Sequence, residues 1–143
     1  MSVRTVAAWL TAHLKWWLEG TSKMATILYV DDDVKRLVVL QHRLEKVGHK
    51  VATAQSGATG LDLFQQTPFD LAIVDYRMPG MDGGEVAHNM RRLKPAVPII
   101  IFSGLLTLPE RVMALVDGFI SAGDDPDALF DEVDKLTKMR MAS

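Results

Sequence analysis

The sequence predicts an α/β domain with a doubly wound, five-stranded parallel sheet and an N-terminal helical extension. Two observations carry this prediction. From residue 26 onward, short apolar runs alternate with helix-patterned segments, and polar or small residues follow each apolar run. Strict alternation of strand and helix implies parallel strands joined by right-handed crossovers, with helices on both faces of the sheet. The 143 residues, of which 48% are hydrophobic, suffice for one such domain.

Five strands are predicted from the apolar runs. Residues 27–30, 71–74 and 98–102 are almost entirely apolar, which is typical of parallel strands buried on both faces. Two further runs, at 50–54 and 118–121, are short and bounded by glycine or by polar residues, and they complete the set.

Helices are predicted between these strands from the spacing of apolar residues. The expected ranges are 34–47, 57–66, 84–93, 108–116 and a final helix that ends at about residue 140. Asp33 is placed to cap the first helix, and Gly48 is placed to end it. Asp125 followed by Pro126 is typical of a helix N-terminus, so we expect the final helix to begin there.

Residues 1–23 are predicted to be a helical extension that precedes an α/β domain of residues 25–140. Apolar residues at positions 3, 6, 10, 14 and 17 follow helical spacing. We favour a helix that packs on its own domain or is a frayed appendage, and the alternative is a helix that docks on a partner, a second copy or a membrane surface. We expect no membrane contact through it.

Composition and charge exclude several classes of protein. The chain has no cysteine, which excludes disulfide scaffolds, thiolate zinc sites and cysteine nucleophiles. A net charge of −2 offers no broad basic surface to nucleic acid. No run approaches the roughly 18 apolar residues of a membrane span, and no secretory signal is recognised. We therefore expect a cytoplasmic protein that does not bind nucleic acid.

Carboxylates follow two of the predicted strands at the point where each strand ends. Asp31 and Asp32 follow the first strand and Asp75 follows the third, while Ser103 follows the fourth. In doubly wound sheets, ligands bind beyond the carboxyl ends of the strands. A helix cap or a solvated loop explains one such aspartate, but poorly explains a pair that faces a third. Oxygen ligands suit a hard cation, so the sequence predicts a magnesium (Mg²⁺) site here.

Three segments, at 27–33, 73–83 and 98–104, resemble a response-regulator receiver domain of the CheY-like superfamily. The middle segment contains Asp-Tyr-Arg-Met-Pro-Gly-Met-Asp-Gly, which is specific in this context, and the resemblance covers about residues 25–140. It implies the flavodoxin-like receiver fold, bound Mg²⁺ and phosphorylation of an aspartate.

The resemblance also implies a role for each matching residue. Asp75 matches the phosphoacceptor, and Ser103 matches the hydroxyl residue that contacts the phosphoryl group. Asp31, Asp32, Asp75 and the backbone carbonyl of Arg77 match the metal ligands. A carboxylate nucleophile that carries an acyl phosphate beside Mg²⁺ is consistent chemistry.

Two positions near the fifth strand bear on switching. Phe119 lies where the family has its switch aromatic residue. Ala122 lies where the family has a lysine, and no lysine occurs in residues 95–134. Three readings follow. The domain still phosphorylates but switches weakly, or it is a degenerate receiver, or another cation substitutes, with Arg77 the nearest candidate in sequence and Arg111 a second.

The resemblance implies a single-domain response regulator of a two-component phosphorelay, which is not an enzyme beyond its own phosphorylation and dephosphorylation. A histidine kinase or a histidine phosphotransfer protein would supply the phosphoryl group. Its output would be contact with an unknown downstream protein or pairing as a homodimer. The alternative is a degenerate receiver that acts as a phosphorylation-independent interaction module.

A phosphatase of the haloacid-dehalogenase type is the rival enzyme class. Asp31-x-Asp33, then Ser103 and a late acidic pair, follow that family's order. That family needs a lysine between the serine and the acidic pair, which is missing here, and the motif around Asp75 would be left without a role. In this class, the nucleophile would be Asp31 instead of Asp75.

Overall fold

The computed structural model describes residues 24–142, so the predicted extension of residues 1–23 lies outside the described residues. Ten elements alternate as strand and helix, and the strands are β1 (Thr26–Val30), β2 (Lys50–Ala54), β3 (Leu71–Val74), β4 (Ile99–Ser103) and β5 (Gly118–Ser121). All four strand pairs are parallel, in the order β2-β1-β3-β4-β5. The predicted doubly wound, five-stranded parallel sheet is confirmed.

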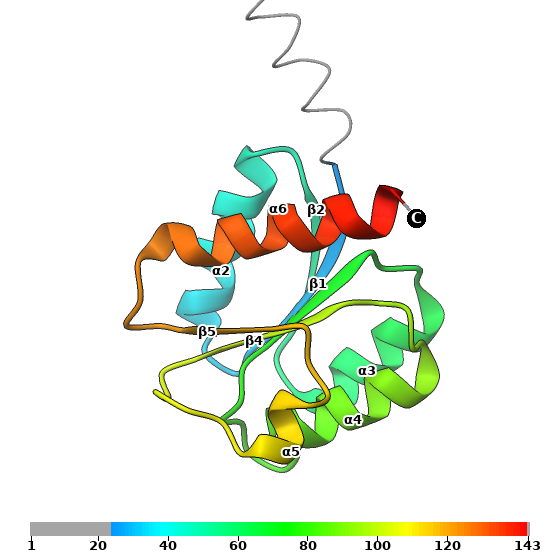
Figure 1. Cartoon of the computed structure of the whole chain (residues 1–143), viewed down its shortest axis with the longest axis vertical. Coiled ribbons are helices and arrows are strands. Elements are labelled where there is room, and N and C mark those ends of the chain that lie inside the picture. Colours follow the sequence, from blue (N-terminus) through cyan, green and yellow to red (C-terminus); the bar gives the residue numbers. More distant parts are fainter. Residues whose placement is uncertain (1–23, 143) are drawn as a thin grey trace, which may run out of the picture.

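Five helices cover the two faces of this sheet (Figure 1). They are α2 (Val34–Lys46), α3 (Gly57–Gln66), α4 (Gly83–Leu93), α5 (Glu110–Met113) and α6 (Pro126–Ala142). Buried residues of α2 and α6 share one apolar cluster with Ile27 and Tyr29 of β1. Residues of α3 and α4 share another with Leu28 and Val30. Alternate residues of β1 therefore point to opposite layers, as the pleat of a strand requires.

The chain turns in opposite directions after β1 and after β3. From β1 it crosses to β2 on one side of the sheet, while β3, β4 and β5 follow on the other side. The carboxyl ends of β1 and β3 are neighbours, because Val30 pairs with Val74. Crevices at such switch points are where open α/β sheets bind ligands. The fold thus brings the residues after these two strands together.

Caps that the sequence predicts are present at both ends of α2 and at the start of α6. The Asp33 carboxylate accepts hydrogen bonds from the backbone N–H groups of Lys35 and Arg36. Gly48, with φ of 105°, follows the end of α2 in the left-handed region that glycine tolerates. The Asp125 carboxylate accepts from the N–H of Asp127 in the first turn of α6.

One helix is much shorter than predicted. Residues 108–116 were expected to be helical, whereas α5 comprises only Glu110–Met113. The chain after α5 is bound to neighbouring elements instead of continuing the helix. The N–H of Asp117 donates to the carbonyl of Ile99 at 2.8 Å, and Nε and Nη2 of Arg91 in α4 donate to the carbonyl of Leu115 at 3.0 and 2.7 Å. Asp117, which accepts from Arg91 and from the N–H of Ile99, then directs the chain into β5.

Between residues 24 and 142, no helix is both long and apolar enough to span a bilayer.

Candidate functional site

Three carboxylates meet at the switch point of the sheet. One oxygen from each of Asp31, Asp32 and Asp75 lies within 4.8 Å of the others. Asp31 and Asp32 directly follow β1, and Asp75 directly follows β3. The structure therefore brings together the three aspartates that the sequence singled out.

Asp31 is fully buried and its carboxylate is densely contacted. The Tyr29 hydroxyl donates to Oδ2 at 2.6 Å, and the backbone N–H of Asp33 donates to Oδ1 at 2.9 Å. Burial, followed by the hydrogen bond to Asp31, raises the pKa of Tyr29 far above its usual value. The phenol therefore stays protonated and remains a hydrogen-bond donor to this carboxylate.

A cation that sequence reasoning missed lies against the cluster. Arg36, in the first turn of α2, places Nε 2.7 Å from Asp31 Oδ2 and Nη2 3.5 Å from Asp75 Oδ2. Burial lowers the pKa of Arg36, but the charges of Asp31 and Asp75 outweigh it and raise the value. The sequence feature that could have indicated this cation is a basic residue in the first turn of the helix that follows the acidic pair.

Asp75 is held as a buried, partly neutralised carboxylate. Its backbone N–H donates to the carbonyl of Val30 at 2.9 Å, and its side chain is only 4% exposed. Burial raises the pKa of Asp75 to about 6, Asp31 adds to the increase, and Arg36 opposes it. A carboxylate with this pKa is more basic than usual, which suits a nucleophile that is ionised at neutral pH.

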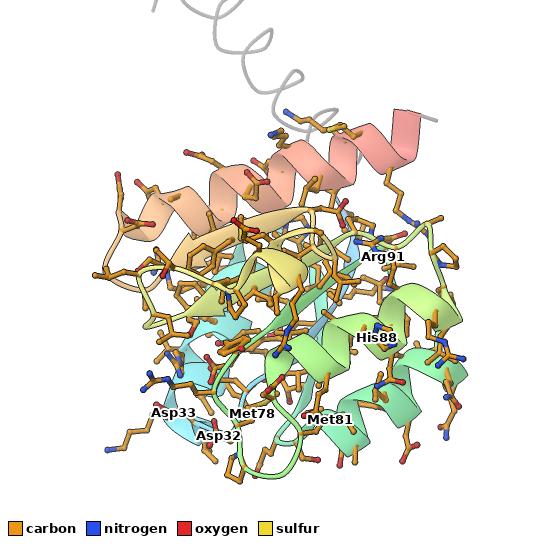
Figure 2. All side chains as sticks on the ribbon, turned by 60° about the horizontal axis from the view of Figure 1, so that its bottom comes forward. Asp32, Asp33, Met78, Met81, His88 and Arg91 are labelled. Carbon is orange, nitrogen blue, oxygen red and sulfur yellow. The ribbon has the colours of Figure 1, made fainter. Side chains whose placement is uncertain are left out.

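Asp32 is the exposed member of the cluster. Figure 2 shows Asp32 beside Asp33, at the same end of the molecule as Met78 and Met81 of the loop after β3. Asp33 contributes a helix cap, as the sequence predicts, and does not belong to the carboxylate cluster. Asp32 is therefore the carboxylate most accessible to an arriving cation.

Ser103 and Ala122 lie next to each other at the carboxyl ends of β4 and β5. Ser103 pairs with Ser121, and the N–H of Ala122 donates to the carbonyl of Ser103 at 2.7 Å. The Ser103 side chain is buried, and its Oγ accepts one long hydrogen bond, of 3.4 Å, from the N–H of Leu105. Among the described residues, no protein atom accepts a hydrogen bond from the Ser103 hydroxyl.

Phe119 and Arg77 occupy different surroundings. Phe119 is half-buried against Ile101, Leu108 and Val112. Arg77 is exposed in the loop after β3. Among residues 24–142, neither Arg77 nor the exposed Arg111 forms an ion pair with the carboxylates, so Arg36 is the cation that contacts them.

The donor set fits a divalent cation of the magnesium type. Three convergent carboxylates repel one another, and each offers an oxygen atom as a ligand. Hard cations with water-completed shells prefer such ligands. Arg36 supplies a single positive charge against three carboxylates, which leaves the cluster able to attract a second cation.

The sheet order and the carboxylates at its switch point define a receiver-type α/β domain. Residues 27–131 match the family described as the response regulator receiver domain, and the chain belongs to that family. The predicted domain bounds of 25–140 extend beyond this match at both ends and stay a prediction.

Curated relatives are longer proteins. The chain is 37% identical over 115 residues to the transcriptional regulatory protein GlrR of Escherichia coli, which covers 78% of this chain and 26% of GlrR. It is 38% identical over 102 residues to the transcriptional regulatory protein AfsQ1 of Streptomyces coelicolor, covering 71% of this chain and 43% of AfsQ1. The chain thus spans less than half the length of these relatives.

Solved structures of receiver proteins share the fold. The response regulator TrrA of Thermotoga maritima, in complex with Mg²⁺-BeF, has a TM-score of 0.75 and 31% identity, covering 79% of this chain and 99% of TrrA. A CheY-like receiver domain protein of Methanospirillum hungatei has a TM-score of 0.77 and 27% identity, covering 83% and 98%.

The family sets the general function. The chain is a receiver domain of two-component response regulators, a family in which bound Mg²⁺ and phosphorylation are typical. Receiver domains are signalling modules that are generally not enzymes, and they interact with histidine kinases or phosphotransfer proteins.

Proposed function

We propose that this chain accepts a phosphoryl group on Asp75 with the help of Mg²⁺ and signals through protein contacts. The observation that carries the proposal is the position of Asp75. It is a buried carboxylate within 4.8 Å of Asp31 and Asp32 at the switch point of the sheet. Burial of a carboxylate is costly, and two acidic neighbours increase that cost. Groups held in such unfavourable surroundings are concentrated at functional sites, which favours a functional role for Asp75.

The transfer consists of one displacement at phosphorus. A carboxylate oxygen of Asp75 forms the new P–O bond, and the P–N bond of a donor phosphohistidine breaks. The bonding electrons stay with the leaving imidazole nitrogen, which takes up a proton. With acetyl phosphate as donor, a P–O bond breaks instead and acetate leaves.

Other residues of the site would hold the metal and the transferred group. Asp31, Asp32, Asp75 and the backbone carbonyl of Arg77 are the proposed Mg²⁺ ligands. When bound, Mg²⁺ supplies charge that stabilises the transferring phosphoryl group. The buried hydroxyl of Ser103 is the proposed donor to a phosphoryl oxygen, because its proton is not committed to a described protein acceptor.

The proposed output is a change at the face formed by α5, β5 and α6. Phe119 is the proposed switch residue, since it is half-buried and packs against the apolar cluster that includes Val112 of α5. A histidine kinase or a histidine phosphotransfer protein is the proposed donor. A downstream protein, or a second copy of the chain, is the proposed receiver of the signal. The stand-alone form expected from the sequence stays a prediction, which the mass of the native protein tests.

Intact-protein mass after incubation with acetyl phosphate tests the proposal. We expect one phosphoryl adduct in the wild type that requires Mg²⁺ and is absent from Asp75→Asn. An adduct that persists in Asp75→Asn, or that forms equally without Mg²⁺, contradicts the proposal.

A degenerate receiver is the second candidate function, and Ala122 favours it. Ala122 is exposed beside Ser103 and carries no charge for a phosphoryl group, whereas the family has a lysine there. In this case the wild type forms no adduct and Ala122→Lys does. That result would make the chain a phosphorylation-independent interaction module.

A further inference from the structure

The acidic cluster already contains a cation of its own. Among residues 24–142, the guanidinium of Arg36 lies within ion-pair distance of both Asp31 and Asp75. Its side chain is only 29% exposed, so the contact is partly shielded from water. The Asp33 cap helps to place it, since the Asp33 carboxylate accepts from the backbone N–H of Arg36 at 3.3 Å.

Arg36 lies against the part of the Asp31 carboxylate that a metal would need to approach. A carboxylate offers about four lone-pair positions. On Asp31, the Tyr29 hydroxyl and the Asp33 N–H take two of them. The Arg36 guanidinium lies over the remaining side of the carboxylate, with Nε 2.7 Å from Oδ2 and Nη2 donating to Oδ1 at 3.4 Å. A metal ion that binds Asp31 directly therefore has to displace Arg36.

The ion pair between Arg36 and Asp31 lacks the aligned geometry of a bidentate arginine–carboxylate pair. Nε is buried and makes no hydrogen bond, so its close approach to Asp31 is a contact between charges. The one hydrogen bond of the pair, from Nη2, is long. Bidentate arginine–carboxylate pairs have two short, aligned bonds, and this pair has neither.

Arg36 also lies close to the oxygen that would carry a phosphoryl group. Nη2 is 3.5 Å from Asp75 Oδ2, so a group bound to Asp75 comes within reach of the guanidinium fork. Guanidinium groups bind phosphoryl oxygens strongly because several N–H donors face them at once. Position 122, at the end of β5, supplies no such charge because it is an alanine.

We propose that Arg36 is the mobile counter-charge of this site. It pairs with Asp31 while the site is empty, gives way to the divalent cation, and then binds the phosphoryl group on Asp75. This inference rests on the proposed function, and it assigns to α2 a charge that the family takes from the position of Ala122. It predicts effects of opposite sign on metal binding and on phosphoryl binding, which a merely structural residue would not produce.

Calorimetric titration with Mg²⁺ tests the first half. Removing Arg36 frees both oxygens of Asp31, so Arg36→Met is expected to tighten Mg²⁺ binding roughly tenfold. Lys35→Met is the matched control, since it removes an exposed charge one residue away on the same helix. We expect it to change the dissociation constant less than about twofold. Equal effects of the two variants, or weaker binding in Arg36→Met, overturn the inference.

Binding of beryllofluoride at saturating Mg²⁺ tests the second half. This anion stands in for the phosphoryl group on a carboxylate. Arg36→Met is expected to weaken its binding roughly tenfold, and Arg36→Met with Ala122→Lys is expected to restore it. Unchanged binding in Arg36→Met overturns the inference. If the wild type binds no beryllofluoride, the proposed function fails, while the Mg²⁺ titration still decides whether Arg36 competes with the metal.

A second variant keeps both tests valid if Arg36→Met folds poorly. Arg36→Lys retains the charge but lacks the planar fork. We expect its effects to have the same signs as those of Arg36→Met and to be smaller. Wild-type behaviour of Arg36→Lys in both titrations shows that charge alone suffices, and effects of reversed sign overturn the inference.

Discussion

Asp75 destabilises the fold that holds it, and this cost varies with pH. Its pKa is about 6 in the folded protein against 3.8 as the reference value, first because it is buried and then because Asp31 is near. Between these two values the folded chain keeps a proton that the unfolded chain has lost. The free energy of unfolding therefore falls as pH rises from about 4 to about 6.

Asp75→Asn is expected to remove this pH dependence. An amide carries no charge, so at pH 7 the metal-free variant should be more stable than the wild type by on the order of 2–3 kcal/mol. Urea unfolding in EDTA at several pH values measures the difference. A variant that is less stable than the wild type at pH 7 would show that the carboxylate is stabilised by its surroundings.

His49 introduces the opposite dependence. It is buried, and its Nδ1 accepts a hydrogen bond from the N–H of Ala25 at 3.2 Å. Burial lowers the pKa of His49, although Asp134 opposes the decrease. As pH falls, His49 is therefore protonated in the unfolded chain before it is protonated in the folded chain. The free energy of unfolding decreases as pH falls from about 6.5 toward the lower pKa that His49 has in the folded protein.

His49→Asn should reduce the acid sensitivity below pH 6.5, because the amide can accept the Ala25 bond without titrating. His88→Asn, at an exposed position of α4 (Figure 2), is the control and should leave the profile unchanged. Thermal unfolding between pH 5 and 7 measures both. Equal profiles for His49→Asn and the wild type would refute a role for His49.

At the scale of elements, the start of α4 lies unusually close to the end of β3. A Cβ on Gly83 would overlap the carbonyl oxygen of Asp75 and lie 2.7 Å from the Cα of Tyr76. Both obstacles are backbone, so neither can move away cheaply. The approach is fixed by the N–H of Gly83, which donates to the carbonyl of Tyr76 at 2.7 Å.

Gly83→Ala is therefore expected to destabilise the protein by on the order of 1–3 kcal/mol. Gly104→Ala is the control, because nothing lies within 4 Å of a Cβ there. Chemical denaturation of the two variants gives the comparison. If Gly104→Ala costs as much as Gly83→Ala, the close approach of α4 to β3 is not the cause.

The elements were predictable wherever local signals determine them. Apolar runs identified the buried strands, and Asp33 and Gly48 marked the ends of α2. The length of α5 was not predictable, because the chain after it is held by residues distant in sequence, Ile99 of β4 and Arg91, which lies 24 residues before the carbonyl it contacts. Contacts over such distances leave no mark on local apolar spacing.

The candidate site was predictable for its carboxylates and not for its cation. Asp31, Asp32 and Asp75 end strands, so the topology alone brings them together. Arg36 lies on a helix whose pattern marks it as a surface position, and Arg77 was the nearer candidate in sequence. The structure is needed to show that the orientation of α2 places the Arg36 side chain beside Asp31 and Asp75.

At the scale of the whole molecule, the proposed metal site links binding to global stability. The carboxylates at the switch point follow β1 and β3, two neighbouring strands of the sheet, so charge repulsion there opposes folding. A ligand that binds only the folded state adds about 2.7 kcal/mol at a hundredfold excess over its dissociation constant. Mg²⁺ should therefore raise the unfolding temperature.

Asp32→Asn should abolish most of this Mg²⁺ effect without harming the fold, because Asp32 is exposed. Asp62→Asn, on the exposed face of α3, is the matched control and should respond to Mg²⁺ like the wild type. Thermal melts with and without Mg²⁺ provide the readout. A full Mg²⁺ response in Asp32→Asn would place the metal elsewhere.

The identity of the phosphorylated residue tests the central claim most directly. Phosphorylation with acetyl phosphate and Mg²⁺, followed by borohydride reduction, converts an aspartyl phosphate to homoserine and marks its position for peptide mass analysis. The account predicts the mark at Asp75 alone, and only when Mg²⁺ is present. A mark at Asp31, as the phosphatase class requires, would contradict it.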